Sequence, residues 1–184
     1  SSDLMKHVNG KLCGLVTLHV DDAMLTGSPE VQADWEVLRK KLKFGSWTSL
    51  HEGGKFLGRW MKQSDDNRLI TITMNEYSAA LQEVECDASL PDDQPLDAQQ
   101  LAQLRASVGQ LGWLAKQGRP DIAFAVSYLQ QNMIDATVST LRLLNSTIKR
   151  AKTPFEVVIR DLQCSLSEIM VVVATDGALA AMPR

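Results

Sequence analysis

Two adjacent aspartates, Asp21 and Asp22, are the residues whose type and spacing could do chemistry in this chain. They stand between two apolar runs, LVTLHV and AMLT. Neighbouring side chains of a straight strand point to opposite faces, but at the bend of a tight hairpin both carboxylates can turn toward one point. Because Mg²⁺ takes oxygen ligands and keeps waters for substrate phosphates, such a pair suits this cation. Two such ions about 4 Å apart serve polymerase and nuclease chemistry.

A second pair, Asp65 and Asp66, provides an internal comparison. Ser64 and Asn67 flank it, as expected for a solvated turn. Neither Gly nor Asn eases a turn at the first pair, and acids placed against apolar strands cost free energy unless something compensates. Two interpretations of the first pair therefore stay open: the carboxylates hold a cation, or they form a polar turn only.

A basic run follows the acidic pair, at the end of a predicted helix: Arg39, Lys40, Lys41 and Lys43. These side chains could contact a nucleic-acid backbone, or they could be the solvated face of the helix. The whole chain has 19 Lys and Arg against 22 Asp and Glu, a net charge of −3. Since dedicated nucleic-acid surfaces are usually basic, the overall charge argues mildly against one.

The remaining chemistry-bearing residues form no pattern. His7, His19 and His51 have no metal-binding spacing, and no Gly-rich phosphate loop or HExxH motif occurs. The three cysteines are odd in number and far apart, which fits neither a disulfide framework nor a zinc site. We therefore expect a reduced, intracellular chain.

The elements that must position these residues follow from hydrophobic periodicity. Residues 12–20 and 23–26 predict a hairpin with the acidic pair at its bend. An N-cap, a proline at the first helical position and regularly spaced apolar residues predict an amphipathic helix over 29–43. The runs 55–63 and 68–73 predict a second hairpin.

The second half of the chain is predicted to be helical and then extended. Gly118 is expected to end the first helix of this half in the left-handed conformation, and Pro120 to begin the next helix. In order, the predicted elements are a helix over 76–84, a loop over 86–97, helices over 101–115, 122–133 and 141–151, and strands over 155–159 and 166–175.

Length and composition fit a folded chain, since 184 residues with 45% apolar and 22% charged can bury a core. No apolar run approaches the roughly 20 residues that span a bilayer, and no signal-peptide pattern opens the chain. We expect a cytoplasmic protein with no membrane partner. The chain opens on Ser1 and stops soon after its most apolar predicted strand. These ends are typical of a fragment.

Five motifs, in this order, resemble those of copia-type retrotransposon reverse transcriptases. LVTLHVDDAMLTGS resembles the YVDD box, FLGRWMKQ the FLG strand, and LITITMNEYSAAL the I-x-I-x-Q-x-x-Y segment of that family. SVGQLGWLAKQGRPDIAFAVSYL resembles the block that follows the polymerase, and ATDGALA resembles the start of the RNase H portion. The collinear resemblance covers nearly the whole chain.

The resemblance implies an α+β fold with an antiparallel palm-type sheet and helices over residues 1–90. A helical thumb or connection over 97–153 would follow, and then the truncated first strands of an RNase H-like domain over 154–184. It implies RNA-directed DNA synthesis in which Asp21 and Asp22 are catalytic and hold Mg²⁺ or Mn²⁺. The implied partners are an RNA or DNA template-primer, dNTPs and the remaining domains of the polyprotein.

Three further sites have implied roles. His19 stands where the family usually has Tyr, next to the incoming nucleotide and the primer end. Asp176 would be the first acid of an RNase H site, although its neighbours depart from the family pattern. The Arg119-Pro120-Asp121 segment resembles the family's RPD turn. For this segment we prefer a junction between helices, with the aspartate in the first helical turn.

Parts of the polymerase are missing from the sequence. The family needs a third palm aspartate from an earlier strand, and Asp3 is the only acid among the 20 residues before Asp21. The fingers are also absent. We therefore expect that the isolated chain does not polymerise. The alternative is a non-catalytic retroelement remnant or interaction module, in which the acidic pair is only a turn.

Overall fold

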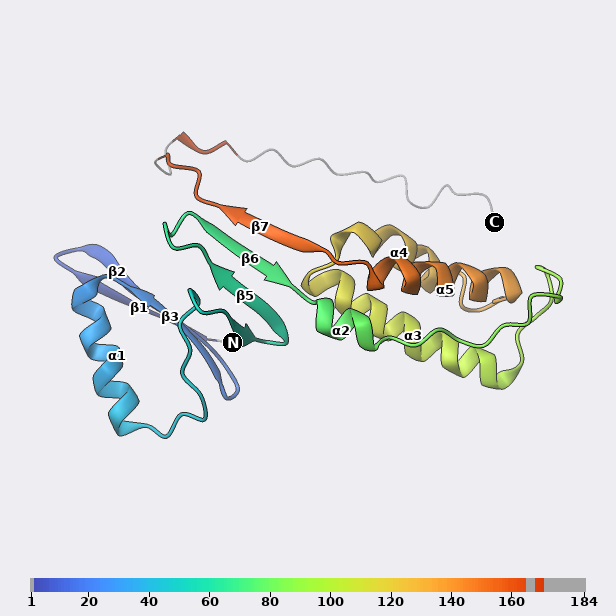
Figure 1. The fold of residues 1–184 in the computed structure, drawn as a ribbon, viewed down its shortest axis with the longest axis horizontal. Coiled ribbons are helices and arrows are strands. Elements are labelled where there is room, and N and C mark those ends of the chain that lie inside the picture. Colours follow the sequence, from blue (N-terminus) through green and yellow to red (C-terminus); the bar gives the residue numbers. More distant parts are fainter. Residues whose placement is uncertain (1, 165–167, 171–184) are drawn as a thin grey trace.

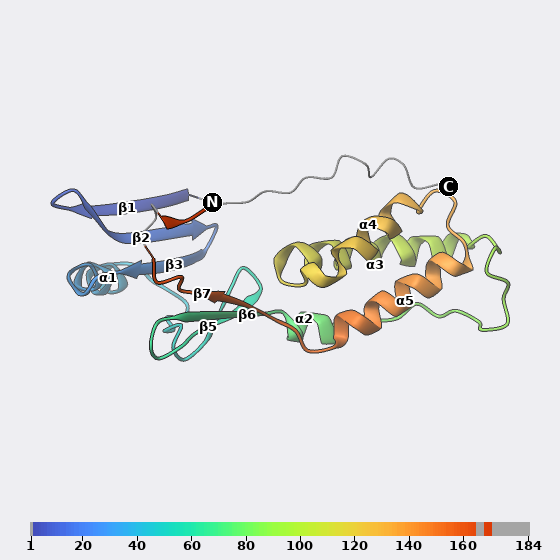
Figure 2. The ribbon, with the colours of Figure 1, turned by 90° about the horizontal axis from the view of Figure 1, so that it is seen from above.

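The molecule has a strand-rich end and a helical end. The computed structural model describes residues 2–164 and 168–170. Two antiparallel sheets and one helix form one end of the elongated chain, and the other helices pack together at the opposite end (Figure 1; Figure 2). This arrangement confirms the predicted α+β class with antiparallel sheets and helices.

The first sheet contains the predicted acidic hairpin. Its strands are antiparallel in the order β1 (Ser2–Val8), β2 (Lys11–His19) and β3 (Asp22–Gly27). The sequence-based prediction lacks β1, because its polar residues interrupt any apolar run. Helix α1 (Pro29–Lys41) packs on this sheet where Gly14 leaves room, since a Cβ there would lie 2.6 Å from Val31.

The second sheet has four antiparallel strands. They are β4 (Gly54–Phe56), β5 (Arg59–Gln63), β6 (Leu69–Thr73) and β7 (Glu156–Arg160). The prediction of one strand over 55–63 is wrong, because Leu57 and Gly58 have φ of 51° and 76° and form a tight turn. The pairing of β6 with β7 crosses the boundary expected at residue 154. One sheet thus contains residues from both sides of that boundary.

The helical end is built on one apolar core. Its elements are α2 (Asn75–Ala80), α3 (Ala98–Gln117), the 3-10 helix η1 (Pro120–Ile122), α4 (Ala123–Gln131) and α5 (Val138–Lys152). Asp97 caps α3 by accepting a hydrogen bond from the Gln100 N–H at 2.7 Å. Leu104, Leu111, Leu141 and other apolar side chains of these helices are fully buried. These contacts confirm the three long predicted helices.

The prediction for Gly118 is wrong, and the predicted strand over 166–175 is mostly untested. Gly118 has φ of −174° and is not left-handed. A glycine suits this position for another reason, because a Cβ would lie 2.9 Å from the Met74 side chain. The predicted strand over 166–175 lies mostly outside the described residues, and residues 168–170 are not in a strand.

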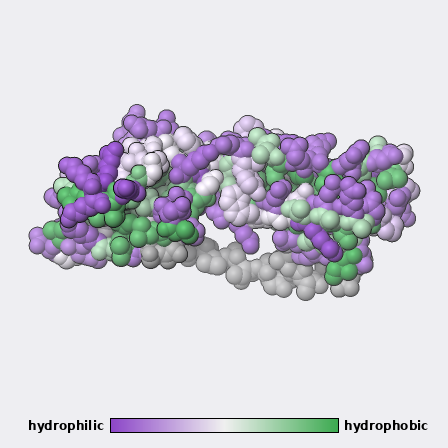
Figure 3. Space-filling view, turned by 90° about the horizontal axis from the view of Figure 1, so that it is seen from below, coloured by the Kyte–Doolittle hydropathy of each residue, from purple (hydrophilic) through white to green (hydrophobic). Residues whose placement is uncertain are grey.

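Several large apolar side chains remain exposed at the strand-rich end. Leu4, Met5 and Leu12 of the first sheet are 57–64% exposed, and Val37 of α1 is 50% exposed. Figure 3 shows hydrophobic side chains gathered on this end of the molecule. Among the described residues, no helix combines the length and the apolar character needed to cross a membrane.

Candidate functional site

The acidic pair lies at the turn of the β2–β3 hairpin, where the sequence places it. His19 pairs with Asp22 at the last rung, so Val20 and Asp21 form a two-residue turn. Val20 has φ of 54°, a left-handed conformation that β-branched residues rarely adopt. Hairpins of this length favour Gly, Asn or Asp at such positions. The turn is therefore strained, and strain of this kind concentrates at functional sites.

Asp22 is held by a contact from the second sheet. Its Oδ2 accepts a hydrogen bond from the backbone N–H of Leu57 at 3.3 Å. Alternate residues of a strand share a face, so Asp22 and Met24 lie on the same side of β3. Met24 packs against the apolar cluster of the second sheet, formed by Phe56, Met61 and Ile72. This packing brings the Asp22 carboxylate to the β4–β5 turn.

The carboxylate oxygens at this turn are ligands of the type that a hard divalent cation prefers, but they are few. Both carboxylates of the pair are exposed, which leaves space for the waters that Mg²⁺ retains. Across residues 2–164 and 168–170, no group of three or more His, Cys, Asp or Glu could hold a metal ion. A cation at this turn would have at most the two carboxylates of the pair as protein ligands among the described His, Cys, Asp and Glu side chains.

The other predicted site residues fall in three places. His19 is exposed and lies directly across the hairpin from Asp22. Asp176 lies outside the described residues. The four basic residues are exposed on the last turn of α1 and just beyond it, at positions 39, 40, 41 and 43. Arg39 also contacts Glu36 at 3.7 Å and the ring of Trp47 at 5.4 Å.

The comparison pair, Asp65 and Asp66, behaves as a solvated turn. Asp66 accepts hydrogen bonds from the Ser64 hydroxyl at 2.6 Å and the Arg68 N–H at 3.1 Å. These bonds, with that from Ser64 first, lower the pKa of Asp66 below its ordinary value of 3.8. All partners of Asp66 lie within two residues of it, whereas Asp22 bonds a residue 35 positions away. The two acidic pairs thus differ in their structural setting.

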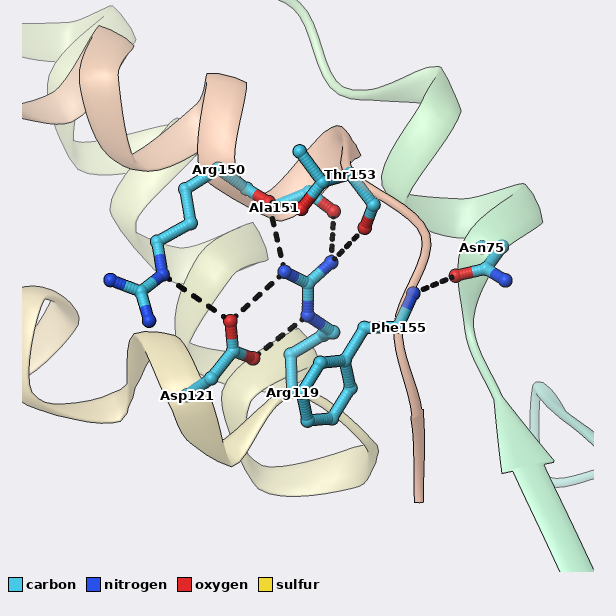
Figure 4. Close-up of polar contacts among 7 residues, drawn as sticks. All are labelled: Asn75, Arg119, Asp121, Arg150, Ala151, Thr153 and Phe155. Carbon is cyan, nitrogen blue, oxygen red and sulfur yellow. Dashed lines mark hydrogen bonds and ion pairs between the residues drawn. The ribbon is translucent and has the colours of Figure 1, made fainter. Parts of the chain in front are cut away.

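The Arg119-Pro120-Asp121 segment is the most buried charged site in the described chain. Arg119 is 1% exposed, and its Nε and Nη2 donate to the two Asp121 oxygens at 2.8 and 3.0 Å (Figure 4). The hydrogen bond from Arg119 is the main cause that lowers the pKa of Asp121 below 3.8, and burial opposes it. Arg150 contacts the same carboxylate at 3.4 Å.

The same arginine satisfies the end of α5. Its guanidinium donates to the backbone carbonyls of Arg150 and Thr153, both at 2.8 Å, and to that of Ala151. Helices end with carbonyls that have no partner inside the helix, so this arginine replaces solvent there. Its guanidinium also lies 4.9 Å from the ring of Phe155. The segment is a structural junction of helices, as the sequence suggested.

Sequence reasoning missed the contact that reaches Asp22. The Leu57-Gly58 dipeptide carries a turn signal, but it is embedded in the apolar run 55–63, which resembles a continuous strand. Both residues have positive φ, as a two-residue hairpin turn of this type requires. The one signal in the sequence is Gly58, because an isolated glycine inside a strand pattern indicates a break in that strand.

The chain was compared with family models, curated proteins and solved structures. No family model matches the chain, and neither a curated protein nor a solved structure matches it.

Proposed function

We propose that the chain is part of an RNA-directed DNA polymerase of a retrotransposon polyprotein, with Asp21 and Asp22 as its catalytic metal ligands. The observation that carries this proposal is the strained two-residue turn. It presents two adjacent, exposed aspartates at the tip of a hairpin whose strands are largely apolar. A turn selected only for easy hairpin formation would not place a valine at φ of 54°.

The chemistry assigned to the pair is nucleotidyl transfer. A bound Mg²⁺ would supply charge neutralisation for the primer 3′-hydroxyl and the departing pyrophosphate. In the chain itself, Asp21 and Asp22 would hold the cation, and the Leu57 N–H donates to one carboxylate oxygen of Asp22. His19, across the rung from Asp22, would stand beside the nucleotide and the primer end. The palm-type nature of the sheets and the RNase H-like nature of residues 154–184 belong to the same proposal.

The template-primer would contact the basic end of α1. Lys40, Lys41 and Lys43 are exposed, and no acidic side chain separates them in the sequence. Exposed lysines bind phosphates by charge, without reading sequence. The other implied partners are dNTPs and further domains of an intracellular polyprotein. These domains would cover the apolar surface of the strand-rich end.

The isolated chain is expected to be inactive in this proposal. Within the described residues no third carboxylate joins the pair, so the clamp for two cations is incomplete. A primer-extension assay with a primed RNA template, dNTPs and Mg²⁺ or Mn²⁺ tests this point. We expect no extension by the chain alone. Template-directed extension would overturn the expected inactivity.

The alternative is a non-catalytic remnant or interaction module, in which the pair is only a turn. It is favoured by one observation, the small number of donors at the pair. Calorimetric titration with Mn²⁺ separates the two proposals. The polymerase proposal predicts a binding heat that Asp21→Asn removes, whereas the alternative predicts the same dilution heat for both proteins.

A further inference from the structure

A continuous set of contacts links the acidic hairpin to the helical end of the molecule. Trp113 of α3 lies against Gly58, where a Cβ would be 3.0 Å from the tryptophan Cη2. Gly58 and Leu57 form the β4–β5 turn, and the Leu57 N–H donates to Asp22. Residues from the two ends of the molecule therefore meet at this one turn.

The backbone of this turn leaves little freedom. Leu57 and Gly58 both have positive φ, 51° and 76°, which closes the hairpin and directs the Leu57 N–H away from the β4–β5 ladder. Because a backbone donor cannot rotate as a side chain can, its place is set by the turn as a whole. A shift of the turn by a few tenths of an ångström moves the donor by the same amount.

Trp113 has a fixed neighbour of its own. Its ring packs on that of Tyr77 in α2, with centroids 4.7 Å apart and planes inclined by 55°. Trp113, Tyr77 and Gly58 also line one cavity of about 410 Å³. Tyr77 in turn packs against the apolar core of the helical end. The ring that touches Gly58 is therefore anchored to the helices rather than to the sheet.

We propose that the Leu57–Gly58 turn is a positioning element for the Asp22 carboxylate, and that Trp113 sets the place of this turn. The orientation of one metal ligand then depends on how the helical end packs against the second sheet. This inference rests on the proposed function in one respect, the binding of a divalent cation by the acidic pair. Groups that orient a metal ligand affect metal affinity without touching the metal.

The chain contains a matched pair of glycines for the test. Gly58 and Gly10 both have φ of 76°, so replacement by alanine strains both backbones alike. A Cβ at Gly58 meets Trp113, whereas a Cβ at Gly10 meets nothing within 4 Å. We expect Gly58→Ala to weaken Mn²⁺ binding by about tenfold, the lower end of the effects seen for partners of metal ligands. Gly10→Ala should leave this affinity unchanged.

A second readout needs no metal. In the whole chain, Asp22→Asn should shift the amide resonance of Leu57, because it changes the acceptor of the Leu57 N–H, and the shift should be smaller in a Gly58→Ala background. Trp113→Leu removes the contact without straining the turn, and we expect it to act in the same direction. This variant serves if Gly58→Ala does not fold.

The outcomes separate the two claims. Mn²⁺ binding by the wild type that is equally strong in Gly58→Ala and Trp113→Leu would overturn the positioning role. A wild type that binds no Mn²⁺ would overturn the proposed function instead, and the response of the Leu57 amide to Asp22→Asn would then decide the positioning role alone. An unchanged amide response in both variants would refute that role.

Discussion

Arg119 and Asp121 form a two-point ion pair beneath the C-terminal end of α5, with N–O distances of 2.8 and 3.0 Å. The arginine is 1% exposed, and the remaining donors of its guanidinium reach three backbone carbonyls of the 150–153 segment. Desolvation of a charge is costly unless every donor finds a partner. Here the complete set of partners makes a buried cation compatible with the core and ties α5 to the α3–α4 junction.

Replacement of Arg119 should therefore be severe. We expect Arg119→Lys to lower the free energy of unfolding by about 3 kcal/mol or more, because a lysine cannot reproduce the fork and leaves several of the buried acceptors around it without a donor. Urea denaturation measures the change. Arg142→Lys is the control, since Arg142 also binds a carboxylate and two carbonyls but its side chain is 38% exposed. Arg142→Lys should lower the free energy of unfolding by about 1 kcal/mol at most. Equal losses of unfolding free energy in Arg119→Lys and Arg142→Lys would contradict the special role of the buried arginine.

The contribution of Asp121 to the free energy of unfolding should depend on pH. Its pKa is lowered on folding, so its stabilising effect is complete above the unfolded value of 3.8 and is lost as the pH falls through the folded pKa. We expect the stability difference between wild type and Asp121→Asn to be constant near neutral pH and to shrink in acid below pH 3.8. Unfolding curves at a series of pH values measure it. Asp66→Asn, at an exposed carboxyl, should show a much smaller difference throughout.

Helix α3 offers a simple stability prediction at Gly109. This glycine is in the middle of the helix, and a Cβ there would meet nothing within 4 Å. Gly109→Ala should raise the free energy of unfolding by about 1 kcal/mol, because alanine loses less backbone entropy in a helix. At Gly112 a Cβ would lie 3.3 Å from the Gln130 amide, so the same change should gain less. Chemical denaturation of both variants gives the comparison. A lower free energy of unfolding for Gly109→Ala would contradict the open space found around this position.

Nucleic-acid binding should depend on the end of α1. We expect the double change Lys40→Glu and Lys41→Glu to reduce the slope of log affinity against log salt by about two, one for each lost phosphate contact. Fluorescence anisotropy with a labelled primer-template at several salt concentrations measures this slope. Lys149→Glu with Lys152→Glu, at the end of α5, changes the charge by the same amount and should leave the slope unaltered. A similar reduction for both pairs would indicate non-specific attraction.

The sequence predicts most elements of this fold because their signals are local. The helix that begins at Pro29, the acidic hairpin and the helices of the core all follow from apolar spacing and caps. The turn at Leu57 is missed, since its residues are apolar and only the glycine marks it. Strand β1 is missed because pairing with β2, rather than its own pattern, makes it a strand.

Non-local contacts account for what the sequence leaves out of the site. The aspartate pair is visible in the sequence, but the Leu57 donor lies 35 residues from Asp22. The carbonyl partners of Arg119 likewise come from a helix about 30 residues away. No spacing rule along the chain reports such contacts, because they arise when separate elements pack.

The most direct test of the central claim locates a divalent cation on the chain. In two-dimensional amide spectra, low concentrations of Mn²⁺ should broaden the resonances of residues 20–23 and of Leu57, which lie beside the acidic pair. The turn at Asp65 and Asp66 has the same two acids and serves as the internal control. We predict that broadening begins at the hairpin and disappears in Asp21→Asn with Asp22→Asn. Equal broadening at both acidic pairs, or none at the hairpin, would contradict the claim that Asp21 and Asp22 form a metal site.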